Sequence, residues 1–359
     1  MSVTRVALLG FGTVGSAVAR RLTSPASFVS PVSSEIVLTH VVDRRAHVKQ
    51  SASGLPRSVR WTDRIDDVLA SDVDIVIETV GGVAPAGEWI RRALLTGESV
   101  VTANKQVVAR EGASLWRLAA RQGRQFRFEA AVGGAMPIVR AVADGLAGDS
   151  LTRIVAILNG TSNAVLSQMD TTGCSMAAAL AEARRRGFAE SDPSADIDGT
   201  DARAKLAILC ALAFGIRLDS NDVAARSISS LGSDDFAVAR QSGRTIRQLA
   251  FADFDRGTST LDAWVAPVAV GRDSIFGRTV GPQNVALLRG AHAGEIGIFG
   301  AGAGGDATAV AIIGDVVSIA RDRAAIVPPP RLTSEFTLRP SIDSFEDAVV
   351  PTLAFAEAV

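Results

Sequence analysis

Chemically reactive side chains are densest between Gly187 and Ala202, where five carboxylates occur without a lysine or arginine. Asp201 and Lys205 stand four residues apart at the start of a predicted helix over 201–214, so their side chains share one face. A lysine fixed beside carboxylates can donate or accept a proton, and carboxylates can hold a substrate ammonium group. From the spacing alone, however, a surface salt bridge between Asp201 and Lys205 is the favoured interpretation.

A second group of interest is the sequence Gly10-Phe11-Gly12-Thr13-Val14-Gly15, directly after a predicted strand over 5–9 and before a predicted helix over 14–22. In such a G-x-G-x-x-G motif the first glycine allows a tight turn, the second lets a pyrophosphate approach the backbone, and the third permits close packing of helix on sheet. The free N–H groups at the start of the helix favour an anion. In this context the motif indicates a dinucleotide site.

The choice of dinucleotide depends on Asp43, Arg44 and Arg45, which end a predicted strand over 36–42. An acid at this place usually binds the ribose hydroxyls of NAD, and an arginine usually meets the 2′-phosphate of NADP. Asp43 follows Gly15 by 28 residues, more than the usual spacing of about 20, and a predicted loop over 24–35 accounts for the excess. The two arginines favour NADP, with Arg44 as the phosphate contact, and the choice between NADP and NAD stays open. That the two arginines are merely solvated is an equally weighted alternative.

The elements that position these residues change in character along the chain. In the first third, predicted strands over 5–9, 36–42, 73–79 and 99–102 alternate with helices over 14–22 and 88–95. This alternation is typical of βαβ units, so we expect an α/β fold with a Rossmann-type doubly wound parallel sheet. Beyond about residue 135 we expect a second, α+β domain. Its predicted elements are a strand over 154–158, helices over 176–186 and 201–214, and short strands divided by Gly and Pro over 261–299; a final helix is predicted over 306–321.

Composition narrows the class of function. The 37 Lys and Arg balance 38 Asp and Glu, so no global basic surface indicates nucleic-acid binding. The chain has no run of 18 uncharged apolar residues, and its first ten residues lead straight into the glycine motif, so we expect neither a membrane span nor a signal peptide but a cytoplasmic enzyme. The two cysteines and three histidines have no spacing suited to zinc or to a disulfide framework.

Five motifs in order give the chain a family resemblance. They are Val101–Lys105 (VTANK), Glu129–Pro137 (EAAVGGAMP), Leu158–Asn163 (LNGTSN), Gly187–Lys205 (GFAESDPSADIDGTDARAK) and Gly302–Thr308 (GAGGDAT). Together they resemble the homoserine dehydrogenase family, and the match extends from residue 5 to about 322. The resemblance overrides the salt-bridge interpretation of Lys205.

The resemblance implies a reaction and roles for individual residues. The reaction is the reversible NAD(P)H-dependent reduction of aspartate 4-semialdehyde to homoserine, on the route to threonine, methionine and isoleucine. Lys205 corresponds to the general acid/base, and Asp201 orients it and the substrate. Glu190 binds the substrate amino group, supported by Asp196, and Lys105 reaches the nicotinamide or the substrate. The implied cofactor-binding residues are Gly10, Phe11, Gly12, Thr13, Val14, Gly15, Asp43, Arg44, Thr79, Lys105 and Gly302.

The resemblance also implies an ion, an assembly and domain boundaries. A sodium ion is expected at the Glu129 carboxylate and the carbonyls of Val132, Gly134 and Met136, and the expected assembly is a homodimer. The expected domains are a nucleotide-binding domain (1–134 and 302–327), a substrate-binding and dimerisation domain (135–301), and a tail (328–359) that begins at Pro328–Pro330. The 36 residues after Arg323 are too few for the regulatory ACT domain of longer family members, so we expect a short form with little inhibition by threonine.

Two other classes of protein are weighed against this one. Aspartate-semialdehyde dehydrogenase needs an activated cysteine, but Cys174 has no adjacent histidine and Cys210 lies in the apolar run LAILCALAF. A non-catalytic NAD(P)-binding regulator needs no proton donor, so Lys105, Glu190, Asp201 and Lys205 together argue against it. Turnover of homoserine with each nicotinamide separates the three classes.

Overall fold

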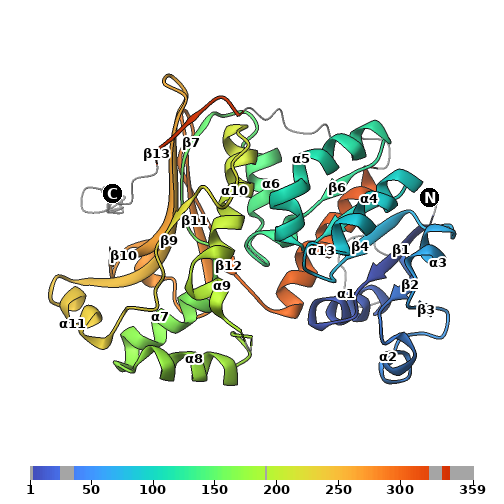
Figure 1. Cartoon of the computed structure of the whole chain (residues 1–359), viewed down its shortest axis with the longest axis horizontal. Coiled ribbons are helices and arrows are strands. Elements are labelled where there is room, and N and C mark those ends of the chain that lie inside the picture. The colour runs from blue at the N-terminus through green and yellow to red at the C-terminus, as the bar shows by residue number, and fades with distance from the viewer. Residues whose placement is uncertain (1–2, 25–35, 191, 323–333, 340–359) are drawn as a thin grey trace, which may run out of the picture. The chain divides into compact units, whose positions relative to one another are not determined.

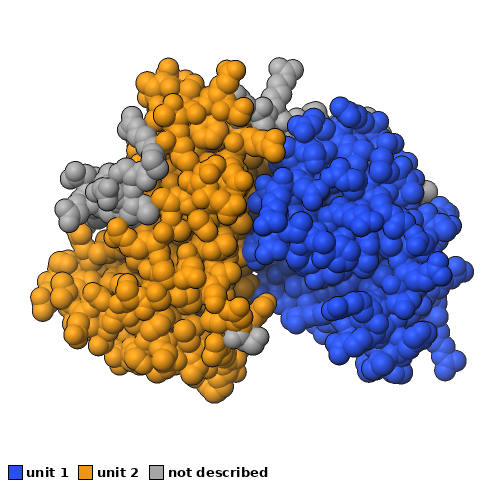
Figure 2. Space-filling model, viewed as in Figure 1, with its two compact units in different colours: residues 1–135, 304–331 blue, residues 136–303, 332–359 orange. Residues whose placement is uncertain are grey.

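The computed structural model describes residues 3–24, 36–190, 192–322 and 334–339, and the chain divides into two compact units. Unit 1 comprises Met1–Ala135 and Gly304–Arg331, and unit 2 comprises Met136–Ala303 and Leu332–Val359 (Figure 2). The predicted loop over 24–35 lies, except for Ser24, outside the described residues.

Unit 1 contains a six-stranded parallel sheet in the order β3-β2-β1-β4-β5-β6 (Figure 1). The order reverses between β1 and β4, as in a doubly wound sheet, so the predicted α/β fold class is confirmed. The predicted strands over 5–9, 36–42 and 99–102 match β1, β2 and β5 to within one residue, and β4 is shorter than predicted. The strand bounds are β1 (Thr4–Leu9), β2 (Ile36–Val42), β3 (Arg60–Thr62), β4 (Ile75–Glu78), β5 (Ser99–Thr102) and β6 (Phe126–Arg127).

The last helix of unit 1 comes from far along the chain. Helix α13 (Gly305–Arg321) packs on α1 (Thr13–Thr23), with Ile312 and Val316 in the same apolar core as Val18. Among the described residues, unit 1 also contains the helices α2 (Ala46–Ala52), α3 (Ile65–Leu69), α4 (Ala86–Thr96) and α5 (Lys105–Arg121) and a 3-10 turn over Glu129–Ala131.

Unit 2 is built on a mixed sheet in the order β12-β11-β7-β9-β10-β13, with β8 also paired to β10. The short strands expected over 261–299 are wrong in length, because β10 runs for 12 residues and pairs throughout with β9, which the sequence did not predict. Pro267 is tolerated inside β10 because, among the described residues, β9 is the only strand paired with β10 at that point. The bounds are β7 (Leu151–Ile157), β8 (Ala224–Ala225), β9 (Arg244–Asp255), β10 (Thr260–Gly271), β11 (Gln283–Gly290), β12 (Gly294–Ala301) and β13 (Thr337–Arg339).

Helices α7, α10 and α11 pack on β9 of this sheet. The helix bounds are α6 (Ile138–Arg140), α7 (Gly160–Thr172), α8 (Met176–Arg185), α9 (Ser194–Ile197), α10 (Thr200–Phe214), α11 (Ser233–Gln241) and α12 (Ile275–Arg278), and a π-helical turn over Ala141–Gly145 follows α6. No helix in the described part of the chain is long and apolar enough to cross a membrane.

The expectation that the compact part ends near Pro328–Pro330 needs correction. These prolines lie outside the described residues, but β13 follows them and pairs in parallel with the first residues of β10. Strand β13 adds one short strand to the sheet beside β10, so the predicted tail contributes to unit 2.

Candidate functional site

The Asp201–Lys205 pair is buried near the start of α10. Lys205 Nζ lies 2.8 Å from Asp201 Oδ2 and donates a hydrogen bond of 2.8 Å to the Leu158 carbonyl. The two residues are only 9% and 4% exposed, so the interpretation as a surface salt bridge is wrong. An ammonium group has three N–H donors, and the described residues accept from two of them. The third remains available to a ligand.

Asn159, which the sequence analysis did not single out, joins the predicted carboxylates. Its Nδ2 donates to Asp196 Oδ1 (2.6 Å) and Asp201 Oδ2 (2.8 Å). Its Oδ1 accepts the Ser162 N–H (2.7 Å), which caps the start of α7. Leu158 and Asn159 therefore bring Lys205, Asp201 and Asp196 together at the end of β7. The only sequence signal was the place of Asn159 in the LNGTSN motif, just before Gly-Thr-Ser.

The turn between α9 and α10 is held from several sides. Gly199 has φ +76°, and an added Cβ would lie 3.1 Å from Val265 Cγ1, so glycine is required at the start of α10. The Ser227 hydroxyl donates to Asp198 Oδ1 (2.9 Å). These contacts fix the direction in which α10 presents Asp201.

Glu190 is the one predicted substrate residue that these bonds do not include. It is exposed, and among the described residues its carboxylate makes no hydrogen bond or ion pair. Its neighbour Asp192 accepts bonds from the Ser194 hydroxyl and N–H, which lower the pKa of Asp192. The carboxylate of Glu190 is therefore free to meet a ligand.

The glycine motif of unit 1 has two glycines that the chain needs and one that it does not. Gly10 has φ +93°, and its added Cβ would meet the Thr79 carbonyl at 2.9 Å. A Cβ on Gly15 would lie 2.0 Å from the Gly10 carbonyl. A Cβ on Gly12 would have no protein atom within 4 Å, so nothing in the chain explains that glycine. The open approach to Gly12 fits a bound pyrophosphate.

The residues around the motif leave the first turn of α1 suited to an anion. Helix α1 begins at Thr13, with neither a side-chain cap nor an acid in its first turn. The Thr79 hydroxyl donates to the carbonyls of Leu9 (3.0 Å) and Gly10 (2.9 Å) and so fixes the turn. Phe11 packs edge-on against Trp61, and Val14 is partly buried in the same core.

Asp43 is already occupied by the protein. Its carboxylate accepts the N–H groups of Phe11 (2.9 Å) and Arg45 (2.9 Å), and Lys49 Nζ lies 2.5 Å from Oδ2. Burial alone would raise the pKa of Asp43, but the bonds from Lys49 and the two amides outweigh it and lower that pKa. Lys49 also donates to the Phe11 carbonyl (2.7 Å), a contact that the sequence analysis missed. Arg44 is exposed and has no hydrogen-bond or ion-pair partner among the described residues.

Two further predicted cofactor residues lie in different units. Lys105 is half-buried and is the first residue of α5, directly after Asn104, whose Oδ1 caps the helix by accepting the Val107 N–H (3.2 Å). Gly302 lies in unit 2, and a Cβ there would fall 2.2 Å from Asn284 Oδ1, so packing within that unit requires glycine. A contact between Gly302 and the cofactor stays a prediction.

The predicted sodium loop has the oxygen groups that a hard cation prefers. Glu129 is 3% exposed, and Gly133 and Gly134 have φ of +81° and +62°. No described residue donates to the carbonyls of Val132 or Gly134, whereas the Met136 carbonyl accepts the Ile138 N–H (2.8 Å). A carbonyl oxygen has two lone pairs, so the Met136 carbonyl keeps one and all three predicted carbonyls can accept a cation. No cluster of three or more His, Cys, Asp or Glu side chains suited to a metal occurs within the described ranges.

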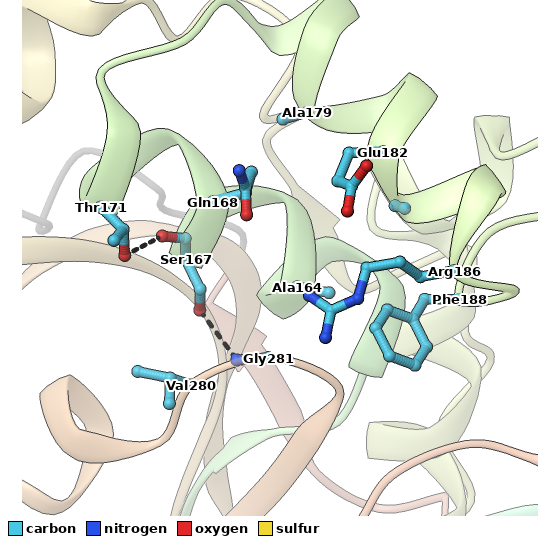
Figure 3. A pocket seen from close by; sticks show the side chains of 11 residues that line it. Ala164, Ser167, Gln168, Thr171, Ala179, Glu182, Arg186, Phe188, Val280 and Gly281 are labelled. Atoms are coloured by element: carbon cyan, nitrogen blue, oxygen red, sulfur yellow. Dashed lines mark hydrogen bonds between the residues drawn. The ribbon is translucent and has the colours of Figure 1, made fainter.

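One pocket of unit 2 lies apart from Lys205. It has a volume of about 290 Å³ and is lined by α7, α8 and the loop at Val280 and Gly281 (Figure 3). The Arg186 guanidinium stands over the Phe188 ring at 5.0 Å, and the Ser167 hydroxyl accepts the Gly281 N–H (3.1 Å). None of Lys205, Asp201 or Asp196 lines it, so it is not where the predicted chemistry occurs.

Comparison with known proteins identifies both parts of the chain. A family model described as the homoserine dehydrogenase NAD-binding domain matches residues 10–129, and one described as homoserine dehydrogenase matches residues 137–317. The homoserine dehydrogenase of Mycobacterium tuberculosis is 39% identical over 331 residues, which are 91% of this chain and 74% of that protein.

Solved structures that are similar to this chain are also homoserine dehydrogenases. The crystal structure of a homoserine dehydrogenase from Thiobacillus denitrificans is similar with a TM-score of 0.87 and 34% identity, over 95% of this chain and 80% of the other. A hyperthermophilic archaeal homoserine dehydrogenase in complex with NADPH matches 92% of this chain and all of its own, with a TM-score of 0.76 and 26% identity. With a nucleotide-binding sheet, a buried lysine–aspartate pair and relatives along most of its length, the chain belongs to the homoserine dehydrogenase family of NAD(P)-dependent oxidoreductases.

Proposed function

We propose that this protein catalyses the reversible reduction of L-aspartate 4-semialdehyde to L-homoserine, with Lys205 as the general acid/base. The observation that carries the proposal is the buried Lys205 ammonium, which keeps one N–H for a ligand while Asp201 and Leu158 fix the other two. The nicotinamide supplies or receives the hydride at the substrate carbon. The protein must place the carbonyl group and move one proton at its oxygen.

In this mechanism each side chain of unit 2 has a separate task. Lys205 gives its third proton to the aldehyde oxygen during reduction and takes it back during oxidation. Asp201 holds Lys205 in place through the contact of its Oδ2 with Nζ. The free carboxylate of Glu190, together with Asp196, binds the ammonium group that the amino-acid substrate carries at neutral pH. Asn159 holds Asp196 and Asp201 in place by donating to both carboxylates.

For the cofactor we propose NADP as the preferred nicotinamide. Ribose hydroxyls need free acceptor sites on Asp43, but Phe11, Arg45 and Lys49 already occupy three of the about four sites of that carboxylate. Lys49 also neutralises the charge that would otherwise repel a 2′-phosphate. Arg44, exposed and unpaired among the described residues, can meet that phosphate. The backbone N–H groups of Gly12, Thr13 and Val14 bind the pyrophosphate, and Lys105 reaches the nicotinamide or the substrate.

Three further assignments complete the proposal. Glu129, with the carbonyls of Val132, Gly134 and Met136, holds a sodium ion. The enzyme is a cytoplasmic homodimer. Its two domains are the predicted nucleotide-binding domain (1–134 and 302–327) and the substrate-binding and dimerisation domain (135–301).

The alternative of a cysteine-dependent semialdehyde dehydrogenase has little support. Cys210 is fully buried in α10, and burial raises the pKa of its thiol, which makes a thiolate nucleophile unfavourable.

Lys205→Ala and Lys205→Arg test the proposal. A guanidinium keeps the positive charge but does not release its proton, so both variants should lose turnover of homoserine by roughly 10²–10⁴. NADPH binding, followed by protein fluorescence, and the circular dichroism spectrum should both stay near wild type, which shows that unit 1 and unit 2 of the variants are folded. An arginine variant with more than about a tenth of wild-type turnover would exclude proton transfer by Lys205.

A further inference from the structure

The carboxyl group of Glu78 is buried at the end of β4, outside the set of site residues predicted from the sequence. The residue is 0% exposed. Its Oε1 accepts the backbone N–H groups of Val80 (2.7 Å) and Gly81 (3.0 Å), and its Oε2 accepts the Thr102 hydroxyl (2.5 Å). All three donors are neutral. Burying a carboxyl group without a cationic partner is costly, so packing alone does not explain why it is present.

The bonds of Glu78 belong to a closed circuit. Thr102 Oγ1 accepts the Asn104 N–H (2.9 Å), and Asn104 Nδ2 donates to the Gly82 carbonyl (2.6 Å). Asn104 Oδ1 accepts the Val107 N–H and so caps α5. The circuit connects the end of β4, the loop over 79–82, the end of β5 and the first turn of α5.

This circuit lies at the edge of the sheet where ligands of doubly wound folds bind. Strand β4 is next to β1 at the point where the strand order reverses. Thr79, directly after Glu78, donates to the Gly10 carbonyl in the glycine motif (2.9 Å). Lys105 follows Asn104 as the first residue of α5. Crevices at such switch points, outside the carboxyl ends of the strands, hold the cofactor.

We propose that Glu78 is a positioning residue for hydride transfer. By fixing the loop over 79–82 and the first turn of α5, it sets the place of the Lys105 ammonium group beside the nicotinamide half of the cofactor. A carboxyl group suits the task because both of its oxygens accept. A glutamine would offer one accepting oxygen and would turn an N–H toward Thr102, whose oxygen already accepts from Asn104. The inference rests on the proposed role of Lys105.

The test is a double-mutant cycle between Glu78→Gln and Lys105→Ala, measured on full-length enzyme oxidising homoserine. Misplacing a reacting group by about an ångström costs up to about 10²-fold in rate, so Glu78→Gln should lower kcat by about 10- to 10²-fold. Binding of 2′,5′-ADP, which probes only the adenosine half of the site, should be unchanged. In the Lys105→Ala background, Glu78→Gln should cause no further loss.

The outcomes separate the two proposals. Equal losses from Glu78→Gln in both backgrounds would overturn positioning through Lys105. Wild-type turnover in Lys105→Ala would overturn the role of Lys105 and this inference together, while the proposal for Lys205 is tested by its own variants. If Glu78→Gln does not fold, Thr102→Val breaks the same circuit and enters the same cycle with the same expected result.

Glu98→Gln is the matched control. Glu98 is also buried in unit 1 and accepts a threonine hydroxyl, that of Thr96 (2.5 Å). It directly precedes β5, at the opposite end of the strand from Thr102. Burial raises the pKa of Glu98, which makes the neutral amide an easy replacement. This variant should keep wild-type kcat, and a loss equal to that of Glu78→Gln would show that any buried carboxyl group in this sheet has the effect.

Discussion

Asp201 and Lys205 meet one helical turn apart on α10, with Oδ2 and Nζ separated by 2.8 Å and both side chains buried. A buried ion pair is sensitive to the loss of either partner, because the remaining charge stays in a poorly solvated place. Replacing either residue therefore disturbs the proposed proton transfer and also leaves a buried charge without its partner. Experiments on this pair must separate the loss of catalysis from the loss of stability.

The direction of the pH dependence follows from the proposed proton transfer. Oxidation of homoserine releases one proton, which passes from the hydroxyl to Lys205, so its kcat should rise toward alkaline pH. Reduction of the aldehyde takes up one proton, so its kcat should fall over the same range. Rates in both directions across pH would check this, and profiles of the same sign in both directions would contradict it.

Replacing Asn159 should impair catalysis and stability together. Asn159→Asp removes the N–H groups that bond Asp196 and Asp201 and adds a third carboxylate beside them. Like charges in hydrogen-bond contact repel, and the buried Asp201 and the half-buried Asp196 each lose one donor, so we expect a loss of about 1–3 kcal/mol in stability. Turnover should fall, mainly through a higher KM for homoserine. Wild-type KM and Tm would show that this amide is not essential to the site.

Cofactor preference should depend on Arg44. Arg44→Ala should raise the KM for NADPH by about 10-fold or more relative to that for NADH, since a charge-assisted bond to a phosphate contributes about 1.5–3 kcal/mol. Arg45→Ala removes the same charge one residue away and is the control. An equal change in both variants would attribute the preference to overall positive charge rather than to a contact of Arg44.

Asp43 should make the stability of unit 1 depend on pH in the acid range. Its pKa is lowered in the folded protein, so its contribution is present above the ordinary aspartate pKa of about 3.9 and is lost as pH falls through the lower folded value. Asp43→Asn should therefore destabilise unit 1 near neutral pH and progressively less toward acid pH. Amide hydrogen exchange of β1 and β2 would measure this. Asp63→Asn, at a surface carboxylate without a described partner, should show no such trend.

Local patterns in the sequence predicted several strands of the fold and the main catalytic pair. The features that were not predicted depend on contacts between residues far apart in the sequence. The apolar runs of β1, β2 and β5 and the i, i+4 spacing of Asp201 and Lys205 are local signals. Strand β9 was missed because polar residues interrupt its pattern. Arg247, for example, is 1% exposed, with its N–H groups bonded to the carbonyls of Gly277 and Thr279, and burial lowers its pKa to about 10.

The site residues that the sequence did not predict also depend on contacts between residues far apart in the chain. Asn159 meets Asp201 across 42 positions of the chain, and Glu78 meets Thr102 across 24. Only the folded chain brings such pairs together. The chain has three lysines, Lys49, Lys105 and Lys205, against 34 arginines (37 minus 3). All three lie at the proposed sites, a bias that could have directed attention to Lys49.

The position of α13 has a consequence for how the protein is made. Its residues Ile312 and Val316 belong to the same core as Val18 and Leu38, yet they are synthesised nearly 300 residues later. On the ribosome, the first 135 residues emerge without the helix that completes their core, whereas the segment from 136 to 303 emerges as one continuous piece. Domains generally fold as units as synthesis proceeds. Apart from β13, unit 2 can therefore fold before the chain that follows residue 303 is made, whereas unit 1 is complete only after α13 has been synthesised.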